Sequence, residues 1–263
     1  MKKKAMAILL GTATIMLTGC TSGVSQEEYD RVVAERDEYK AMLELQGAFP
    51  ESKEEIDSDD EENQGNENTS QKLNLTDSGW LSYKSGDWSH IKYAVQIENP
   101  NTEYAIEFPE IIITAKDSEG KILSTDERTL NSIAAGDTIY YGDEISYEGE
   151  EPATVEISVS NNDRNIEDQD DTKYVRQSDF VISNTSENIG SYDVKYTGEI
   201  TNSSNVDLDT VAVIIIYKQG DSIVGGDIEY VDDLMAGSTK AFELSADPDE
   251  FSYDSYEFYA VQW

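Results

Sequence analysis

The chain has 263 residues, and its 55 acidic residues against 19 basic ones give a formal net charge of −36. This balance excludes a nucleic-acid partner, because phosphate binding needs clustered Lys and Arg side chains. The single cysteine excludes a disulfide framework, so a folded part must be stabilised by its apolar core.

The first 19 residues predict a secretory signal peptide. Three lysines precede an uncharged apolar run. The run is too short to span a membrane, which requires about 20 apolar residues. Leu17, Thr18 and Gly19 then lead to Cys20, and this tetrapeptide resembles the lipobox of bacterial lipoproteins. The resemblance implies a lipid on Cys20, cleavage before it, and attachment to the extracellular face of the cell membrane. An ordinary cleaved signal with an incidental cysteine is the alternative.

Two segments would separate this anchor from the folded part. Residues 20–46 carry the lipidated Cys20 and a helical stalk, which Ser25 and Glu28 begin with a capping box. Its apolar stripe allows either weak self-association or a lone solvated helix. Residues 47–72 are acidic and poor in large apolar side chains, so we expect a disordered linker.

The rest of the chain contains two repeats with a period of about a hundred residues, the size of an immunoglobulin-type sandwich. The matching pairs are Ile91–Tyr93 with Val194–Tyr196, Asn99 with Asn202, Ile111–Ile113 with Ile214–Ile216, and Ile133–Thr138 with Leu234–Thr239. We therefore predict one β-sandwich at 73–160, a polar linker at 161–173 and a second β-sandwich at 174–263.

The pattern inside each repeat indicates β-strands. Ile91, Tyr93, Val95 and Ile97 alternate with polar residues, which predicts a strand with one buried and one wet face. Val211–Tyr217 is continuously apolar, as expected for a strand that is covered on both sides or lies at a domain contact. Polar turn sequences separate such strands. The expected fold class is all-β, with two tandem Ig-like antiparallel β-sandwiches.

The order of these features resembles a known domain family. Each repeat has a strand ending in Asn, a polar loop, a Val- and Ile-rich strand, a turn, and a strand after Ala-Gly-Ser/Asp-Thr. This arrangement resembles the FxLYD-type Ig-like domain of lipoproteins from Firmicutes, and residues 196–244 carry the better match. The resemblance implies an Ig-like fold at the cell envelope and supplies no catalytic residues.

Candidate chemistry is sparse. A Ser–His–acid triad could use only His90, which we expect to open a strand and face solvent. We expect no cofactor. Three loop segments are rich in oxygen-bearing side chains, and we expect them to be solvated. Calcium binding at one of these segments is the alternative. These segments are Asn161–Asp163, Asp168–Asp171 and Asp247–Glu250.

The predicted function is non-catalytic binding or scaffolding at the membrane, with an unknown envelope protein or a glycan as partner. A glycan- or cell-wall-binding module is the first alternative, and an exposed pair of aromatic rings on one face would favour it. A wall-active hydrolase using paired carboxylates is the second, and a cleft with clustered titratable groups would favour that.

Overall fold

The computed structural model describes residues 70–190, 193–246 and 252–263. The signal peptide, the lipobox with Cys20, the stalk and nearly all of the acidic linker lie outside these residues and remain predictions. The described residues all belong to one compact unit. No helix within the described ranges is long and apolar enough to cross a membrane.

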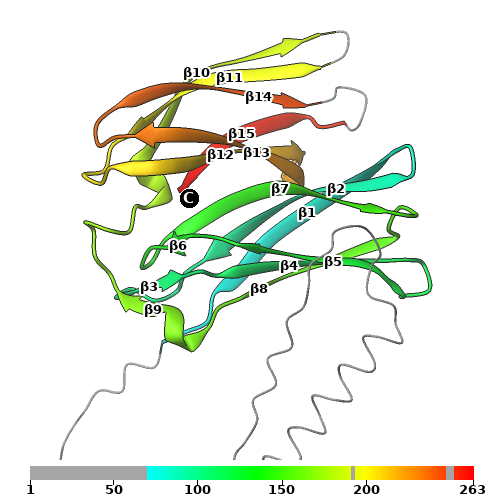
Figure 1. Ribbon diagram of the computed structural model, residues 1–263, viewed down its shortest axis with the longest axis horizontal. Helices are drawn as coiled ribbons and strands as arrows, with labels where there is room; N and C mark the ends of the chain where they lie inside the picture. The colour runs from blue at the N-terminus through cyan, green and yellow to red at the C-terminus, as the bar shows by residue number, and fades with distance from the viewer. Residues whose placement is uncertain (1–69, 191–192, 247–251) are drawn as a thin grey trace, which may run out of the picture. The chain divides into compact units, whose positions relative to one another are not determined.

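The described part is all-β and consists of two antiparallel sandwiches, which confirms the predicted fold class (Figure 1). In sandwich 1, an inner sheet has the order β1-β2-β7 and an outer sheet the order β5-β4-β8. The bounds of the inner strands are β1 Asn74–Ser85, β2 Trp88–Glu98 and β7 Thr138–Glu148. Those of the outer strands are β4 Glu110–Lys116, β5 Ile122–Thr129 and β8 Thr154–Ser160.

Sandwich 2 has an inner sheet of order β13-β12-β15 and an outer sheet of order β10-β11-β14. The inner strands are β12 Leu208–Gln219, β13 Ser222–Leu234 and β15 Ser255–Gln262. The outer strands are β10 Phe180–Ile189, β11 Val194–Asn202 and β14 Thr239–Ala246. The two inner sheets pack on each other, so four layers are stacked in Figure 1.

Strand β12 shows how the sequence encodes this stack. All residues from Val211 to Tyr217 are buried, as predicted from the continuous apolar run. Ala212, Ile214 and Ile216 join the core of sandwich 1. The alternate side chains face outer sheet 2, where Ile215 and Tyr217 pack with Tyr196. A strand with period-two side chains and two apolar faces must lie between two sheets.

The alternation prediction for β2 is wrong on one face. Ile91, Tyr93, Val95 and Ile97 point into sandwich 1 as expected, but Lys92 and Ala94 on the opposite face are also buried. Inner sheet 2 covers that face. A single apolar cluster therefore continues from sandwich 1 into inner sheet 2.

Glycines permit the close contact between the inner sheets. A Cβ placed on Gly142 of β7 would lie 2.9 Å from the Cα of Gly226 in β13. A Cβ on Gly79 of β1 would lie 1.9 Å from the carbonyl oxygen of Ile223. The backbones of the two sheets thus approach each other where side chains are absent.

The predicted linker 161–173 is largely structured. A short helix, η1 (Asp163–Asn165), is followed by β9 (Ile166–Asp168), which pairs with β3 (Tyr104–Glu107). β3 also pairs with β6 (Ser132–Ile133). Ile166 packs against the core, which explains why this polar stretch folds onto sandwich 1. A second short helix, η2 (Gln177–Asp179), then leads into sandwich 2.

The repeat is visible in two buried asparagines. Asn99 donates its amide protons to the carbonyls of Ile133 and Ala134. Asn202 likewise donates to the carbonyl of Leu234, at 3.1 Å. Each side chain thereby satisfies carbonyl groups of the turn before the next strand, and burial without these partners would carry a free-energy cost.

Candidate functional site

A polar cluster lies between the two inner sheets. Lys92 has a side chain that is only 5% exposed, and its Nζ lies 2.7 Å from Glu144 Oε2 and 2.6 Å from Asp227 Oδ2. Glu144 also lies 2.7 Å from His90 Nδ1 and accepts a hydrogen bond from Tyr83. The His90 ring stacks on Tyr83 at 4.7 Å. We name these five residues the interface cluster.

Burial and pairing act against each other in the interface cluster. Burial lowers the pKa of Lys92, but Asp227 and Glu144 outweigh it and hold the pKa above its ordinary value. Burial raises the pKa of Asp227 although Lys92 opposes it. Burial also acts to raise the pKa of Glu144, but Lys92, His90 and Tyr83 together lower it. The arrangement suits a fixed ion-pair network that holds two sheets in register.

This cluster overturns the expected position of His90. Its side chain is 21% exposed and points to Glu144 rather than into solvent. Sequence reasoning missed this because the residues it contacts come from β1 and β7, and the second sandwich covers the neighbouring Lys92. A lysine flanked by apolar residues in the middle of a strand was the available signal.

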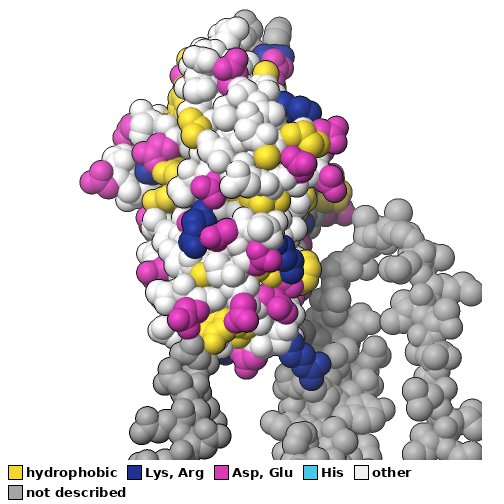
Figure 2. Space-filling model, turned by 90° about the vertical axis from the view of Figure 1, so that its left-hand side faces the viewer, with side chains coloured by type: hydrophobic (Ala, Val, Ile, Leu, Met, Phe, Trp, Pro, Cys, Tyr) yellow, Lys and Arg dark blue, Asp and Glu magenta, His cyan; other side chains and the backbone are white. Residues whose placement is uncertain are grey.

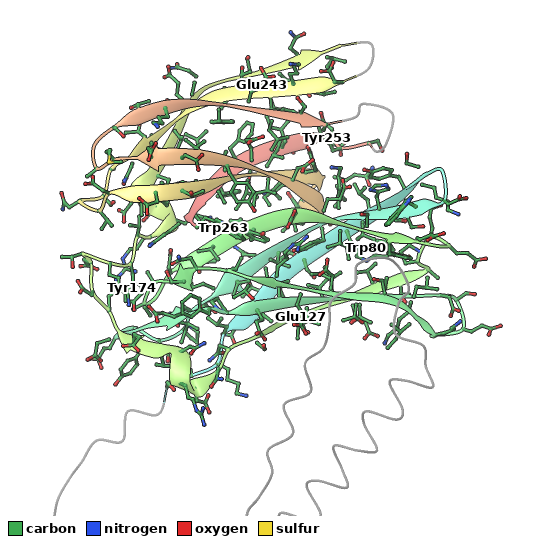
Figure 3. All side chains as sticks on the ribbon, in the orientation of Figure 1. Trp80, Glu127, Tyr174, Glu243, Tyr253 and Trp263 are labelled. Carbon is green, nitrogen blue, oxygen red and sulfur yellow. The ribbon has the colours of Figure 1, made fainter. Side chains whose placement is uncertain are left out.

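A second site lies where inner sheet 2 passes the edge of β7. Tyr230 of β13 is 42% exposed and Trp263 is 36% exposed, and their ring centroids are 5.3 Å apart. Trp263 also lies parallel to buried Tyr141, with centroids 6.1 Å apart. Figure 3 shows Trp263 between inner sheet 2 and β7. We call the pair of exposed rings the aromatic rim.

Charged groups border the aromatic rim. Arg128 Nε donates to Asp143 Oδ2 at 2.7 Å, and Asp126 lies 3.8 Å from the same guanidinium. Burial raises the pKa of Tyr230, and Asp143 adds to the shift while Arg128 reduces it. These charges therefore act on the rim. The rim combines two aromatic rings with more carboxylate groups than cationic groups around them.

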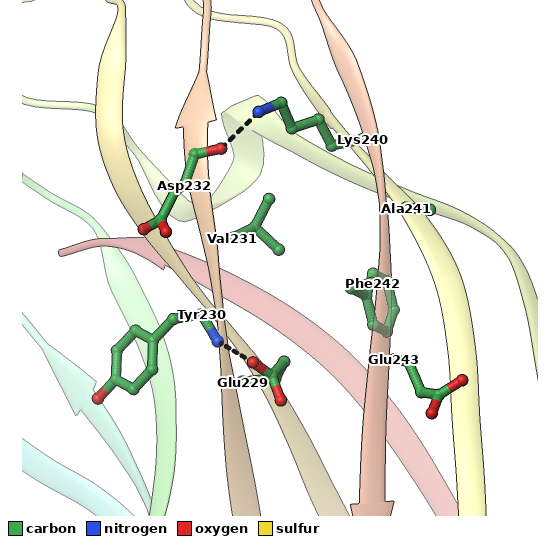
Figure 4. Close-up of a pocket in the computed structure, with 8 residues that line it drawn as sticks. All are labelled: Glu229, Tyr230, Val231, Asp232, Lys240, Ala241, Phe242 and Glu243. Atoms are coloured by element: carbon green, nitrogen blue, oxygen red, sulfur yellow. Dashed lines mark hydrogen bonds between the residues drawn. The ribbon is translucent and has the colours of Figure 1, made fainter.

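A shallow groove continues from the rim between the edge strands β13 and β14 (Figure 4). Val231 and Phe242, both largely buried, form its floor. Lys240 Nζ donates to the Asp232 carbonyl at 2.7 Å. In Figure 4 the Tyr230 ring points away from Phe242, so it belongs to the rim more than to the groove.

Carboxylates protect the edge strands. In β13 the backbone N–H of Ile228 donates to Asp227 and that of Tyr230 donates to Glu229. The same contact between a carboxylate and the next N–H occurs at Ser78 in β1, Glu127 in β5 and Glu144 in β7. An edge N–H that is already paired is a poor template for an added strand. Side-chain docking is therefore favoured over strand addition.

Acidic side chains are also spread over the surface. Figure 2 shows one face, with carboxylates scattered among a few basic side chains and no continuous basic patch. Such a surface favours solubility and attraction of cationic groups.

Two of the three candidate calcium segments, Asn161–Asp163 and Asp168–Asp171, lie among the described residues. Among the residues that the structure describes, no group of three or more Asp, Glu, His or Cys side chains could hold a metal ion. Asp170 instead accepts hydrogen bonds from the backbone and side chain of Thr172. The Asn162 side chain caps η1. Asp247–Glu250 lie outside the described residues, as do Leu17, Thr18, Gly19 and Cys20.

No protein family and no curated protein matches the chain. Among solved structures, the N-terminal CBM22-1–CBM22-2 tandem domain of Xyn10C from Paenibacillus barcinonensis aligns with it at 10% sequence identity. The alignment covers 70% of this chain and 85% of that chain, with a TM-score of 0.13. A TM-score this low carries no inference, so the fold description rests on the strands and sheets themselves.

Proposed function

We propose that this chain is a lipid-anchored lipoprotein on the extracellular face of the cell membrane. Its head binds a partner and catalyses no reaction. The Leu17-Thr18-Gly19-Cys20 sequence supports the anchor, and the resemblance of the repeats to FxLYD-type domains supports a place at the cell envelope. The apolar cluster of sandwich 1 extends across the contact between the inner sheets, so the two sandwiches offer one fixed surface.

The aromatic rim is the observation that carries the binding role. Tyr230 and Trp263 expose two neighbouring rings, and the carboxylates of Asp143 and Glu229 act on Tyr230 against the single cation Arg128. Lys or Arg side chains bind over aromatic rings, and nearby carboxylates strengthen the attraction. The first candidate partner is therefore a basic segment of an envelope protein.

The experiment is capture of envelope proteins by the soluble chain from Thr21 to Trp263. Tyr230→Ala together with Trp263→Ala should abolish specific capture, and raised salt should weaken capture by the original chain. Trp88→Ala is the matched control, because Trp88 is 44% exposed and lies outside the rim. Equal capture by the double variant and the original chain would refute the rim as the binding site.

Anchoring is tested separately. Cys20→Ala should release the protein into the medium or leave an uncleaved precursor. If the signal peptide of the variant is removed and the protein still fractionates with membranes as the original does, the proposal of a lipid anchor is wrong.

A glycan is the second candidate ligand, because the same exposed ring pair could stack on sugar rings. Binding to purified cell-wall polysaccharide that has been treated with protease would favour it over a protein partner. Release of soluble sugar fragments from that material would instead support the hydrolase alternative.

A further inference from the structure

The first repeat has a pocket at a place where the second repeat has a continuous strand. The alignment of Ile111 with Ile214 places Phe108 opposite Val211 and Pro109 opposite Ala212. Val211 and Ala212 are fully buried in β12 and pair with β15. In the first repeat the equivalent strand is divided into β3 and β4. Pro109 explains the break, because proline cannot donate to a strand ladder.

The neighbouring strand β8 ends beside this break. Pairing of β4 with β8 ends at Glu110 and Ser160, whereas the equivalent pairing in the second repeat continues to Val211 and Gln262. Residues 161–165 then turn away into η1. The two departures leave a pocket with a volume of about 350 Å³. We call it the Phe108 pocket.

Phe108 is held in an unfavourable position at the pocket. Its φ is +49°, a region that bulky residues rarely adopt, and its side chain is 52% exposed. Two backbone hydrogen bonds hold the turn, from Phe108 N–H to Asn131 and from Leu130 N–H to Pro109, both at 2.9 Å. Backbone strain of this kind clusters at functional sites.

The rest of the lining is polar and nearly uncharged. Its side chains are those of Glu110, Thr129, Ser160, Asn161, Asn162 and Asn165. The Asn161 side-chain oxygen accepts from the Leu73 N–H, but its Nδ2 is buried without a hydrogen-bond partner. The polar groups of this lining are therefore not all satisfied within the described part of the chain.

We propose that the Phe108 pocket binds one neutral sugar unit of a saccharide. An apolar ring can stack on the face of a sugar, while amides and hydroxyls pair with its hydroxyl groups. Glu110 accepts from hydroxyl groups and repels anionic ligands, as does the net charge of −36. The inference rests on the glycan candidate and gives it a site distinct from the aromatic rim.

The test uses the isotopically labelled soluble chain from Thr21 to Trp263. Two neutral probes, cellotetraose and chitotetraose, are titrated to millimolar concentration and backbone amide shifts are recorded. At least one probe should shift the amides of Phe108, Glu110 and residues 160–165. Phe108→Gly should weaken binding by about tenfold or more, because a lost stacking contact of about 1.4 kcal/mol has that effect.

Phe108→Gly also separates binding from folding. Glycine adopts positive φ readily, so this variant should melt at the same temperature as the original chain or higher. Trp88→Ala, at another exposed aromatic residue, should leave the titration unchanged. No shifts with either probe would overturn the proposal. Shifts confined to Tyr230 and Trp263 would overturn it as well, but would leave glycan binding at the rim intact.

Discussion

Lys92→Met is the sharpest test of how the two sandwiches are joined. The substitution keeps the apolar stem and removes the ammonium group between Glu144 and Asp227. Both carboxylates come from other strands, β7 and β13, and would then lack their buried cation. The second repeat supplies a matched control at Lys195, which pairs with Glu243 on the surface.

The magnitude follows from burial. Removing one partner of a buried ion pair destabilises a protein by about 3–5 kcal/mol. Glu144 keeps its contacts with His90 and Tyr83, so we expect the lower end, about 3 kcal/mol. For a folded part of this size, that loss lowers Tm by about 6–12 °C. Lys195→Met should leave the free energy of unfolding almost unchanged, because both partners are largely exposed.

The pH dependence gives a second readout. Burial raises the pKa of Asp227, and Lys92 limits that rise. Without Lys92 the pKa of Asp227 in the folded state is higher still. A group whose pKa is raised on folding stabilises the fold below its unfolded pKa, and this contribution is lost as pH rises through the folded value. The loss in free energy of unfolding caused by Lys92→Met should therefore be small near pH 4 and grow toward pH 7.

The assay is denaturant unfolding of both variants and the original chain at several pH values. Asp227→Asn added to Lys92→Met should recover part of the lost free energy, because the unpaired charge is then absent. A deficit equal to that of Lys195→Met, or one independent of pH, would refute the view that Lys92 is a buried ion-pair partner.

Three further substitutions test the fold. Gly142→Val should force the inner sheets apart, because even a Cβ there would lie 2.9 Å from the Cα of Gly226. We expect the free energy of unfolding to fall by about 1–3 kcal/mol or more and hydrogen exchange in β13 to become faster. Unchanged exchange would contradict the close contact. Asn202→Ala should cost about 1–3 kcal/mol by leaving the Leu234 carbonyl unpaired, measured by urea unfolding; an unchanged midpoint would remove its structural role. Ile215→Asp should abolish cooperative melting at neutral pH, because a carboxylate would be buried unpaired; an unaltered Tm would mean that this position is not in the core.

The sequence alone determined the local features. The apolar run of β12 predicted burial on both faces, and the matched asparagines marked equivalent turns in the two repeats. Period-two alternation in β2 identified the face that enters sandwich 1. These features depend on neighbours in one strand or on a repeat visible in the chain, so they can be recognised without coordinates.

Only the tertiary structure decided what covers the other faces. Lys92 pairs with Asp227, 135 residues away, and no pattern in β2 indicates that partner. The aromatic rim combines Tyr230 with the chain-terminal Trp263, and the Phe108 pocket forms where two strands part. Alternation in a strand records that a face is apolar or polar, but the choice of covering sheet depends on contacts between residues far apart in the sequence.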